Sequence, residues 1–466
     1  MLSLFACSVP ARDLSSATLM MLNILVINGS PKGKYSTTLQ TSLYLQKKFP
    51  QCNFDFINAG QRIKAFEKDF TPAAEAVAKA DVLLFSYPVY TFLVPSQLHR
   101  FIELLKASGM DLSGKTATQV TTSKHFYDIT AHKFIEDNCA DMSLPFVEGL
   151  SADMDDLLTE TGQRQAVEWF RMLLWNIDKC YFKKPDYFAP GFVPEPATGC
   201  APVPKSSERR AVIVADMKDG DSALQAMVDR FLAIFPYECD VVNIEDFPFL
   251  GGCISCFNCS ATGKCFYKDG FDEFLRGTIH RHDAIIYAFR IQDHSMGSRF
   301  KMYDDRQFCN GHRTVTMGTP FGYIIDGRYS QENNLRTVLE ARAQVGGNFL
   351  AGVAGNESGT DEALRRLSDS LCYAMENGIV MPQNFLGVGG MKIFRDLIFL
   401  MRGLMRADHR FFKSHGQYDF PQKKFGTSMK MYLVGSLMHN QKLRSKIGNK
   451  MNEGMIKPYR EVVERI

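Results

Sequence analysis

A diverged internal repeat constrains how this 466-residue chain can fold. The apolar run 24–27 is followed by a turn and by a helical pattern over about 37–49. The same order recurs in the second half, at 212–214 and about 222–235. A chain of this length is too long for one hydrophobic core. The repeat therefore predicts two domains of similar topology.

The apolar runs also predict the fold class. A second matched pair, at 80–85 and 282–287, again begins a short apolar run after a helical stretch. Buried runs of this kind that alternate with helices are typical of parallel sheets covered on both faces. We therefore predict an α/β protein with two tandem, doubly wound parallel-sheet domains.

Composition suggests where the domains begin and end. Six prolines between residues 185 and 204 exclude helix and central strand and predict an extended linker. We expect a disordered leader, or the product of an upstream start codon, followed by a first domain, the linker, a second domain and an appendage, with the bounds 1–20, 21–183, 184–207, 208–390 and 391–466. Twelve cysteines without a recognisable secretory signal favour a reducing compartment, which we expect to be the cytoplasm.

The appendage is basic, whereas the rest of the chain is acidic. Residues 391–466 hold sixteen Lys/Arg and six Asp/Glu, a balance of +10 in a chain of net charge +3. Apolar residues at helical spacing between 393 and 405 predict an amphipathic helix. Such a helix could dock on the protein's own domains, join two subunits or lie on an anionic membrane. We expect no binding to nucleic acid.

Four cysteines within thirteen residues form the sharpest chemical signal. Cys253, Cys256, Cys259 and Cys265 follow the pattern C-x2-C-x2-C-x5-C, which brings four thiols together on one loop. The compact first part is the spacing of iron–sulfur ligation, most simply a 4Fe-4S cluster. Zinc sites usually separate two ligand pairs. A redox-active thiol cluster without metal, or buried cysteines that act as small apolar residues, are the other interpretations.

A polar loop follows the first predicted strand. Residues 28–38 read NGSPKGKYSTT and lead into a helix, which brings hydroxyls, lysines and a helix N-terminus together. This is the arrangement that binds phosphate groups. The loop matches neither the NTPase pattern nor the dinucleotide pattern. The alternative is an ordinary turn in which Ser36 or Thr37 caps the helix.

These motifs resemble a known family. Gly29-Ser30-Pro31 with Ser36-Thr37-Thr38 is similar to the FMN phosphate loop of the flavodoxin-like NAD(P)H-dependent FMN reductases and multimeric flavodoxins. Two further loops, at 86–92 and 120–126, fit the family's flavin-covering segments. The resemblance implies that FMN is bound by Ser30, Lys32, Ser36, Thr37, Thr38, Pro88, Val89, Tyr90, Phe92, Thr121, Thr122 and Ser123.

The second domain resembles the same family at other points. Lys301, Asp305 and Arg306 fit a K-x-x-x-D-R element, and the cysteine run resembles that of the iron–sulfur flavoprotein branch. Its own phosphate loop is replaced by residues 215–222, where three aspartates would repel a phosphate. We therefore expect FMN in the first domain only and the cluster in the second. His125, Arg290 and Arg306 are further candidates for contact with the flavin or NADPH, although surface or salt-bridge roles explain them as well.

The expected function is a flavin-dependent oxidoreductase. It would pass electrons between NAD(P)H or a reduced carrier and a small-molecule or protein acceptor, through FMN and the cluster. The alternatives are a non-catalytic electron-transfer or redox-sensing flavoprotein, and an NAD(P)H:quinone or FMN reductase without a cluster. Members of the family are typically dimers, so the tandem repeat is expected to act as a pseudo-dimer, with homo-oligomers also compatible. Two independent domains on a flexible linker are the simpler alternative.

Overall fold

A computed structural model describes residues 21–183, 193–199 and 201–438 of the chain. The predicted leader, residues 184–192 and 200 of the predicted linker, and the end of the appendage lie outside these residues. Two compact units are distinguished, 1–409 and 410–466, and each is described by itself. The first unit contains both predicted α/β domains.

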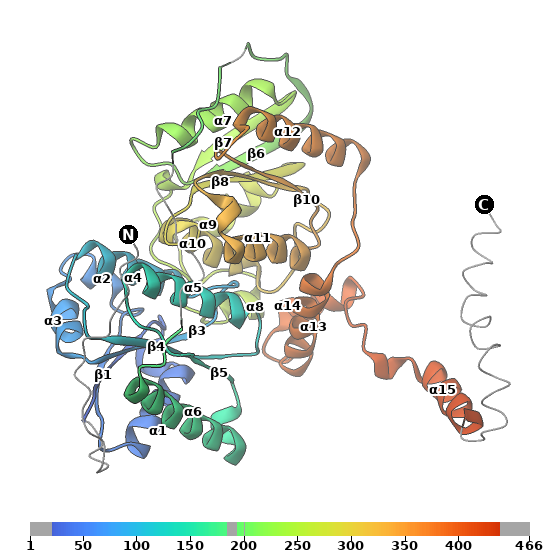
Figure 1. The fold of residues 1–466 in the computed structure, drawn as a ribbon. Helices are drawn as coiled ribbons and strands as arrows, with labels where there is room; N and C mark the ends of the chain where they lie inside the picture. The colour runs from blue at the N-terminus through green and yellow to red at the C-terminus, as the bar shows by residue number, and fades with distance from the viewer. Residues whose placement is uncertain (1–20, 184–192, 200, 439–466) are drawn as a thin grey trace. The chain divides into compact units, whose positions relative to one another are not determined.

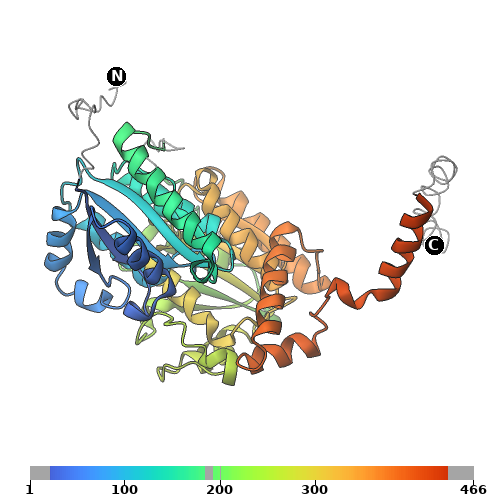
Figure 2. The same cartoon turned by 90° about the horizontal axis from the view of Figure 1, so that it is seen from below.

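Domain one is a parallel five-stranded sheet with helices on both faces (Figures 1 and 2). Its strand order is β2-β1-β3-β4-β5, the doubly wound order in which strand order reverses beside β1. The strands are β1 Asn23–Asn28, β2 Asn53–Ile57, β3 Val82–Pro88, β4 Thr116–Ser123 and β5 Leu150–Asp153. The helices are α1 Thr37–Lys48, α2 Ile63–Phe66, α3 Thr71–Lys79, α4 Ser96–Ala107, α5 Asp128–Asp141 and α6 Glu160–Lys179.

Domain two repeats this topology. Its sheet has the order β7-β6-β8-β9-β10, again parallel throughout. The strands are β6 Ser206–Ala215, β7 Tyr237–Asn243, β8 Ala284–Arg290, β9 Phe321–Asp326 and β10 Leu350–Gly355. The helices are α7 Ser222–Ile234, α8 Asn258–Thr262, α9 Phe271–Phe274, α10 Gly297–Arg306, α11 Asn333–Gly346 and α12 Thr360–Asn377. The predicted fold class of two doubly wound domains is confirmed.

The two domains share one apolar core. In domain one, α1 and α6 cover the outer face of the sheet, while α3, α4 and α5 cover the face toward domain two. A single cluster of buried side chains includes Phe101 and Phe134 of domain one together with Phe300 and Val338 of domain two. Apolar burial is the largest favourable term in protein association, so a shared core argues against two independently moving domains.

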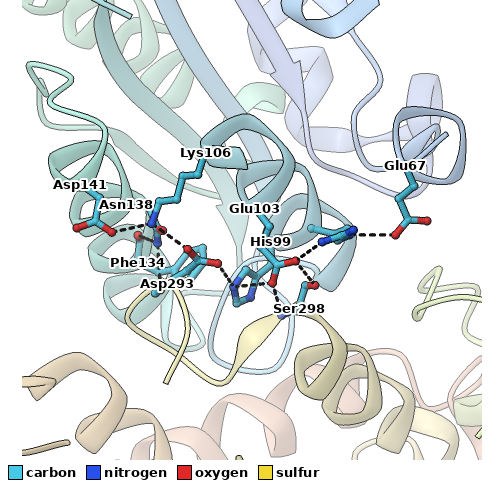
Figure 3. Close-up of polar contacts among 10 residues, drawn as sticks. Glu67, His99, Glu103, Lys106, Phe134, Asn138, Asp141, Asp293 and Ser298 are labelled. Atoms are coloured by element: carbon cyan, nitrogen blue, oxygen red, sulfur yellow. Dashed lines mark hydrogen bonds and ion pairs between the residues drawn. The ribbon is translucent and has the colours of Figure 1, made fainter. Parts of the chain in front are cut away.

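Polar contacts reinforce this interface in reciprocal fashion. The backbone N–H of Ser96, the first residue of α4, donates to Asp305 Oδ2 of α10 at 2.9 Å. The backbone N–H of Ser298, near the start of α10, donates to Glu103 Oε1 of α4 at 2.8 Å (Figure 3). A helix leaves its first N–H groups without partners inside the helix. Each domain therefore supplies the carboxylate that caps the other domain's interface helix.

The C-terminal helices differ from the sequence-based expectation. Instead of one helix through residues 393–405, helix α13 spans Phe385–Leu400 and begins before the predicted start of the appendage. The chain then turns at 401–404, where Arg402 donates to the carbonyl of Phe399, and α14 Arg406–Ser414 follows. Helix α13 packs on α11 of domain two (Figure 1). Helix α15 Phe425–Met438 belongs to the second unit. None of the described helices is long and apolar enough to cross a membrane.

The interface contains a histidine whose titration should be visible in protein stability. His294 of domain two lies 3.1 Å from Asp141 of domain one and 3.1 Å from Glu332 of domain two. Burial lowers the pKa of His294, but its hydrogen bonds to these two carboxylates outweigh burial and raise the pKa to about 9.

We predict that this bridge makes stability fall as pH rises. The pKa of His294 is higher in the folded protein than in the unfolded chain, so its contribution is fully present below about pH 6.5 and is lost by about pH 9. The upper bound is about 3 kcal/mol. Denaturant unfolding of wild type and His294→Asn between pH 6 and 9.5 should show the difference between them shrinking with pH. A constant difference would contradict the bridge. Asn also suits the positive φ of 60° at this position.

Candidate functional site

A pocket lies between the two domains, at the carboxyl ends of the domain-one strands. In open α/β sheets ligands bind at this edge, beside the reversal of strand order. Its walls come from the loops after β1, β3 and β4, the cysteine loop of domain two, the end of α10 and α13. Nine predicted flavin residues and all four predicted cysteine ligands line it, namely Ser30, Lys32, Ser36, Thr37, Pro88, Val89, Tyr90, Thr122 and Ser123 with Cys253, Cys256, Cys259 and Cys265.

The other three of the twelve predicted flavin residues do not line the pocket. Thr38 is fully buried, and its hydroxyl lies 2.6 Å from the hydroxyl of Thr122. Thr121 is also buried, with its hydroxyl 2.8 Å from His132 Nε2. Phe92 packs in the core against the rings of Phe126 and Tyr127. These three side chains support the pocket wall from behind.

The predicted phosphate loop, residues 28–38, is held in shape by its own polar groups. Asn28 accepts from the backbone N–H of Ser30 and donates to the carbonyl of Gly33, which closes the loop. Ser36 caps α1 by accepting from the backbone N–H of Leu39. Gly33 has a φ of +55°, and a Cβ there would lie 2.2 Å from Gln61 Oε1. The positive φ therefore favours glycine at this position, whereas the flexible Gln61 side chain could move away from a Cβ.

The loop after β3 makes a tight turn beside the pocket. Tyr90 and Leu93 exchange backbone hydrogen bonds of 2.8 and 3.0 Å, and Thr91 and Phe92 between them have φ values of 42° and 69°. Such angles are costly for residues other than glycine. Tyr90 lines the pocket and is 7% exposed, and its hydroxyl has no hydrogen-bond partner among the described residues. Burial raises its pKa well above the ordinary value.

The cysteine loop connects β7 with α9 and contains the short helix α8. Cys256 is exposed, whereas the other three predicted ligands are partly buried. Burial, followed by the nearby Asp408 and the neighbouring cysteines, raises the pKa of Cys259 to about 11. Burial likewise raises the pKa of Cys253. Buried thiols of this kind ionise readily only when a cation shares their site.

The four thiols do not form a single-ion site in this conformation. Among the described residues, the one group of three donor atoms within 4.8 Å of each other is His99, Glu103 and Asp293, at the domain interface (Figure 3). Its carboxylates are already paired with Arg100 at 2.7 Å and Lys106 at 2.9 Å. A tetrahedral zinc site needs donors in close mutual contact.

Arg306 fixes the cysteine loop to the body of domain two. Its guanidinium donates to both oxygens of Asp269, at 2.7 and 2.8 Å, and to the carbonyl of Gly251 at 2.8 Å. It also lies over the rings of Tyr267 and Phe271, with centroids at 4.6 and 4.8 Å. The fork geometry of arginine suits this bidentate contact. Of the two roles considered from the sequence, contact with the flavin or NADPH and a structural salt bridge, Arg306 therefore has the salt bridge.

Lys32 connects the phosphate loop of domain one with the cysteine loop of domain two. Its ammonium group lies 5.3 Å from the centroid of the Phe257 ring. Burial lowers the pKa of Lys32, and the nearby Cys253 and Cys256 act in the opposite direction. Domain one also anchors the cysteine loop directly, since Gln97 donates to the carbonyl of Cys253 at 3.3 Å.

Two other candidates have partners that do not belong to the pocket. Arg290 pairs with Asp221 at 2.8 Å and with Asp326 at 2.7 Å. This network occupies the region of domain two where a phosphate loop would lie. There, burial raises the pKa of Asp216 to about 6. His125 is about half exposed and lies 2.7 Å from Asp128.

Several residues of the pocket were not predicted from the sequence. Helix α13 contributes Ile393, Phe394 and Leu397, and Phe394 stacks on Phe126 with ring centroids 4.5 Å apart. The apolar stripe from 393 onward was visible in the sequence. Its packing partner was not, because amphipathic periodicity shows that a helix face is buried but not what covers it.

Comparison with known proteins gives one family match. Residues 22–132 match the family described as NADPH-dependent FMN reductase. No curated protein matches the chain.

Solved structures of several oxidoreductases match parts of the chain at low identity. An NADH:FMN oxidoreductase in its apo form is 17% identical, with a TM-score of 0.29, over 35% of this chain and 92% of that one. An NAD(P)H:quinone oxidoreductase from Methanothermobacter marburgensis is 9% identical, with a TM-score of 0.28, over 36% and 100%. An FMN-dependent NADH-azoreductase from Bacillus anthracis is 13% identical, with a TM-score of 0.24, over 34% and 97%.

The family match covers the part of the chain that builds the domain-one wall of the pocket. It includes the phosphate loop, the turn at Tyr90 and the end of β4. The class of enzyme that it supports is the NAD(P)H-dependent flavin oxidoreductases. Residues 22–132 thus form a segment similar to the NADPH-dependent FMN reductase family, set in a chain with a second domain of the same fold.

Proposed function

We propose that the chain is an NAD(P)H-dependent oxidoreductase that binds FMN in domain one and an iron–sulfur cluster in domain two. The observation that carries this proposal is that the predicted flavin loops and the four cysteines line one pocket. Two redox centres in one pocket would be close enough to exchange electrons. The acceptor would be a small molecule or another protein that takes electrons from this pair.

The chemistry of the donor groups fits FMN in domain one. Thr37 is exposed at the start of α1, Ser30 and Ser36 line the pocket beside it, and Lys32 adds positive charge. Hydroxyls and backbone N–H groups at a helix N-terminus are suited to a phosphate. In domain two, Asp221 and Arg290 pair with each other at the corresponding edge, which supports a single flavin per chain.

The chemistry of the thiols fits an iron–sulfur cluster. Cys253, Cys256, Cys259 and Cys265 come from one short loop, and all face the same pocket. The loop is held by Arg306 and Gln97, so the ligands are supported on both sides. Thiolate ligands and sulfur-rich spacing favour iron–sulfur clusters over harder metal ions. Free thiols of this kind also suit a reducing compartment such as the cytoplasm.

When bound, FMN exchanges two electrons with NAD(P)H or one at a time, and the cluster exchanges one. The residues of this chain would position and shield these groups. Tyr90 and Phe126 line the pocket, and Phe394 of α13, stacked on Phe126, would shield it from water on one side. Lys32 lies between the predicted phosphate loop and the cysteine loop, where its positive charge would stabilise negative charge on the bound FMN or on the thiolates.

The internal repeat is proposed to act as a pseudo-dimer. The reciprocal caps at Ser96 and Ser298 are the pattern of an isologous two-fold interface, here within one chain. This brings the cysteine loop of one repeat to the flavin loops of the other. The remaining basic residues of the appendage are proposed to contact another subunit or, as the alternative, an anionic membrane surface.

A reductase without a cluster is the second candidate function, because the family match extends over domain one only. A non-catalytic electron carrier is the third. Anaerobic steady-state oxidation of NADH and NADPH with an artificial acceptor separates the enzyme from the carrier. Turnover by FMN-loaded protein supports the enzyme, and loaded protein that reduces no acceptor would reject it.

We predict that one FMN binds per chain and that removing one phosphate contact weakens it. Thr37→Val should lower affinity by about 1.5–3 kcal/mol, the usual contribution of a hydrogen bond to a charged group. Ser222→Ala is the matched control, since Ser222 begins α7 of domain two as Thr37 begins α1. Fluorescence titration with FMN measures both. Weakening by the control, or two flavins per chain, would contradict the assignment.

We predict a cluster held by the cysteine loop, with about four iron and four sulfide per chain in anaerobically purified protein. Cys259→Ser should abolish it while FMN binding persists. Cys372→Ser is the control, because Cys372 has similar partial burial but lies outside the loop. Iron and acid-labile sulfide analysis, with EPR after reduction, measures the outcome. Iron-free protein, or stoichiometric zinc, would reject the cluster.

A further inference from the structure

The interface helices and the turns beside them are related by a constant sequence offset. Ser96 and Ser298 are 202 residues apart, and so are their capping partners Glu103 and Asp305. The turn at Tyr90 has its counterpart at Gln292, which exchanges backbone hydrogen bonds of 2.9 and 3.0 Å with Ser295. The two residues between them, 293 and 294, also have positive φ values. The interface therefore preserves the same strained turn twice.

The two copies of this turn are held in different ways. Lys301 of α10 donates to the carbonyl of Tyr90 at 3.0 Å and forms an ion pair with Asp305. The position equivalent to Lys301 in α4 is His99, whose ring nitrogens make no hydrogen bond among the described residues. Its Nε2 lies 3.4 Å from Asp293 Oδ2 (Figure 3). The domain-two turn is held from domain one by other groups, since Asn138 donates to the carbonyl of Asp293 at 3.2 Å and Lys106 pairs with the Asp293 carboxylate at 2.9 Å.

We propose that Lys301 is a positioning residue for the flavin site of domain one. The inference rests on the proposed function, because it assumes that the pocket beside Tyr90 takes FMN. Lys301 would not touch the flavin. It would act through Tyr90, whose ring forms part of the pocket wall.

The surroundings of Lys301 suit this role. Lys301 and Asp305 are both fully buried, and Asp305 also caps α4, which starts directly after the flavin-facing loop. A buried ammonium group that is paired and donates to a carbonyl makes a strong, directional contact. Residues held at positive φ persist only where the surrounding structure fixes them. Lys301 supplies such a constraint at the base of the Tyr90 turn.

The asymmetry follows the proposed division of cofactors. Domain two keeps the lysine that supports the flavin loop of domain one. Domain one has His99 at the equivalent position, and His99 faces the turn of domain two. Beside that turn, Arg290 and its two carboxylate partners fill the edge where a phosphate loop would lie. The lysine contact is therefore present at the turn beside the proposed flavin loop, whereas Asn138 and Lys106 hold the turn beside the changed loop.

The test compares Lys301→Met with His99→Met in the full-length protein. Both changes remove a buried polar group from equivalent positions of one interface. We expect Lys301→Met to weaken FMN binding at least tenfold and to change the visible circular dichroism of the bound flavin, with His99→Met within about threefold of wild type. Equal effects of the two variants, or an unchanged dissociation constant and spectrum in Lys301→Met, would overturn the inference.

Two further arms keep the result unambiguous. If Lys301→Met does not fold, Asp305→Asn decides by the same readouts, because it removes the charge partner of Lys301 but keeps an acceptor for Ser96. A loss of thermal stability with unchanged FMN affinity and spectrum would assign Lys301 a merely structural role and reject the inference. Wild-type protein that binds no FMN would instead reject the proposed function itself.

Discussion

The contact between α4 and α10 is the constraint on which the rest of the structure depends. Each helix receives a carboxylate cap from the other domain, and apolar side chains of both domains merge into one core around it. This arrangement fixes where the carboxyl end of the domain-one sheet lies relative to domain two. Without it, the phosphate loop and the cysteine loop would belong to separate surfaces.

A second consequence is that one end of α10 serves two walls of the pocket. Lys301 contacts the proposed flavin loop of domain one and Asp305 caps α4 directly after it, whereas Arg306 holds the cysteine loop of domain two. Three charged residues within two turns of α10 therefore fix the proposed flavin loop and the cysteine loop relative to each other. Movement of either domain would be transmitted to both proposed cofactor sites at once.

Much of this architecture follows from local sequence signals, and some does not. Apolar runs such as 24–27 identified the strands, because both faces of a parallel sheet are buried. The polar loop at 28–38 was recognisable for a similar reason, since hydroxyls and lysines are concentrated between a strand and a helix. The inward orientation of Thr38, Thr121 and Phe92 was not predictable, because it depends on which helix covers each side chain. The contact of Lys301 with Tyr90 joins residues 211 positions apart, which no local pattern encodes.

The most direct test of the account is a crystal structure of the anaerobically purified protein with FMN, recorded at the iron absorption edge. The account predicts flavin density beside Thr37 and Tyr90 and an anomalous signal within the loop of Cys253, Cys256, Cys259 and Cys265. Flavin density at the Asp216 edge of domain two, or no iron signal at the cysteine loop, would contradict it.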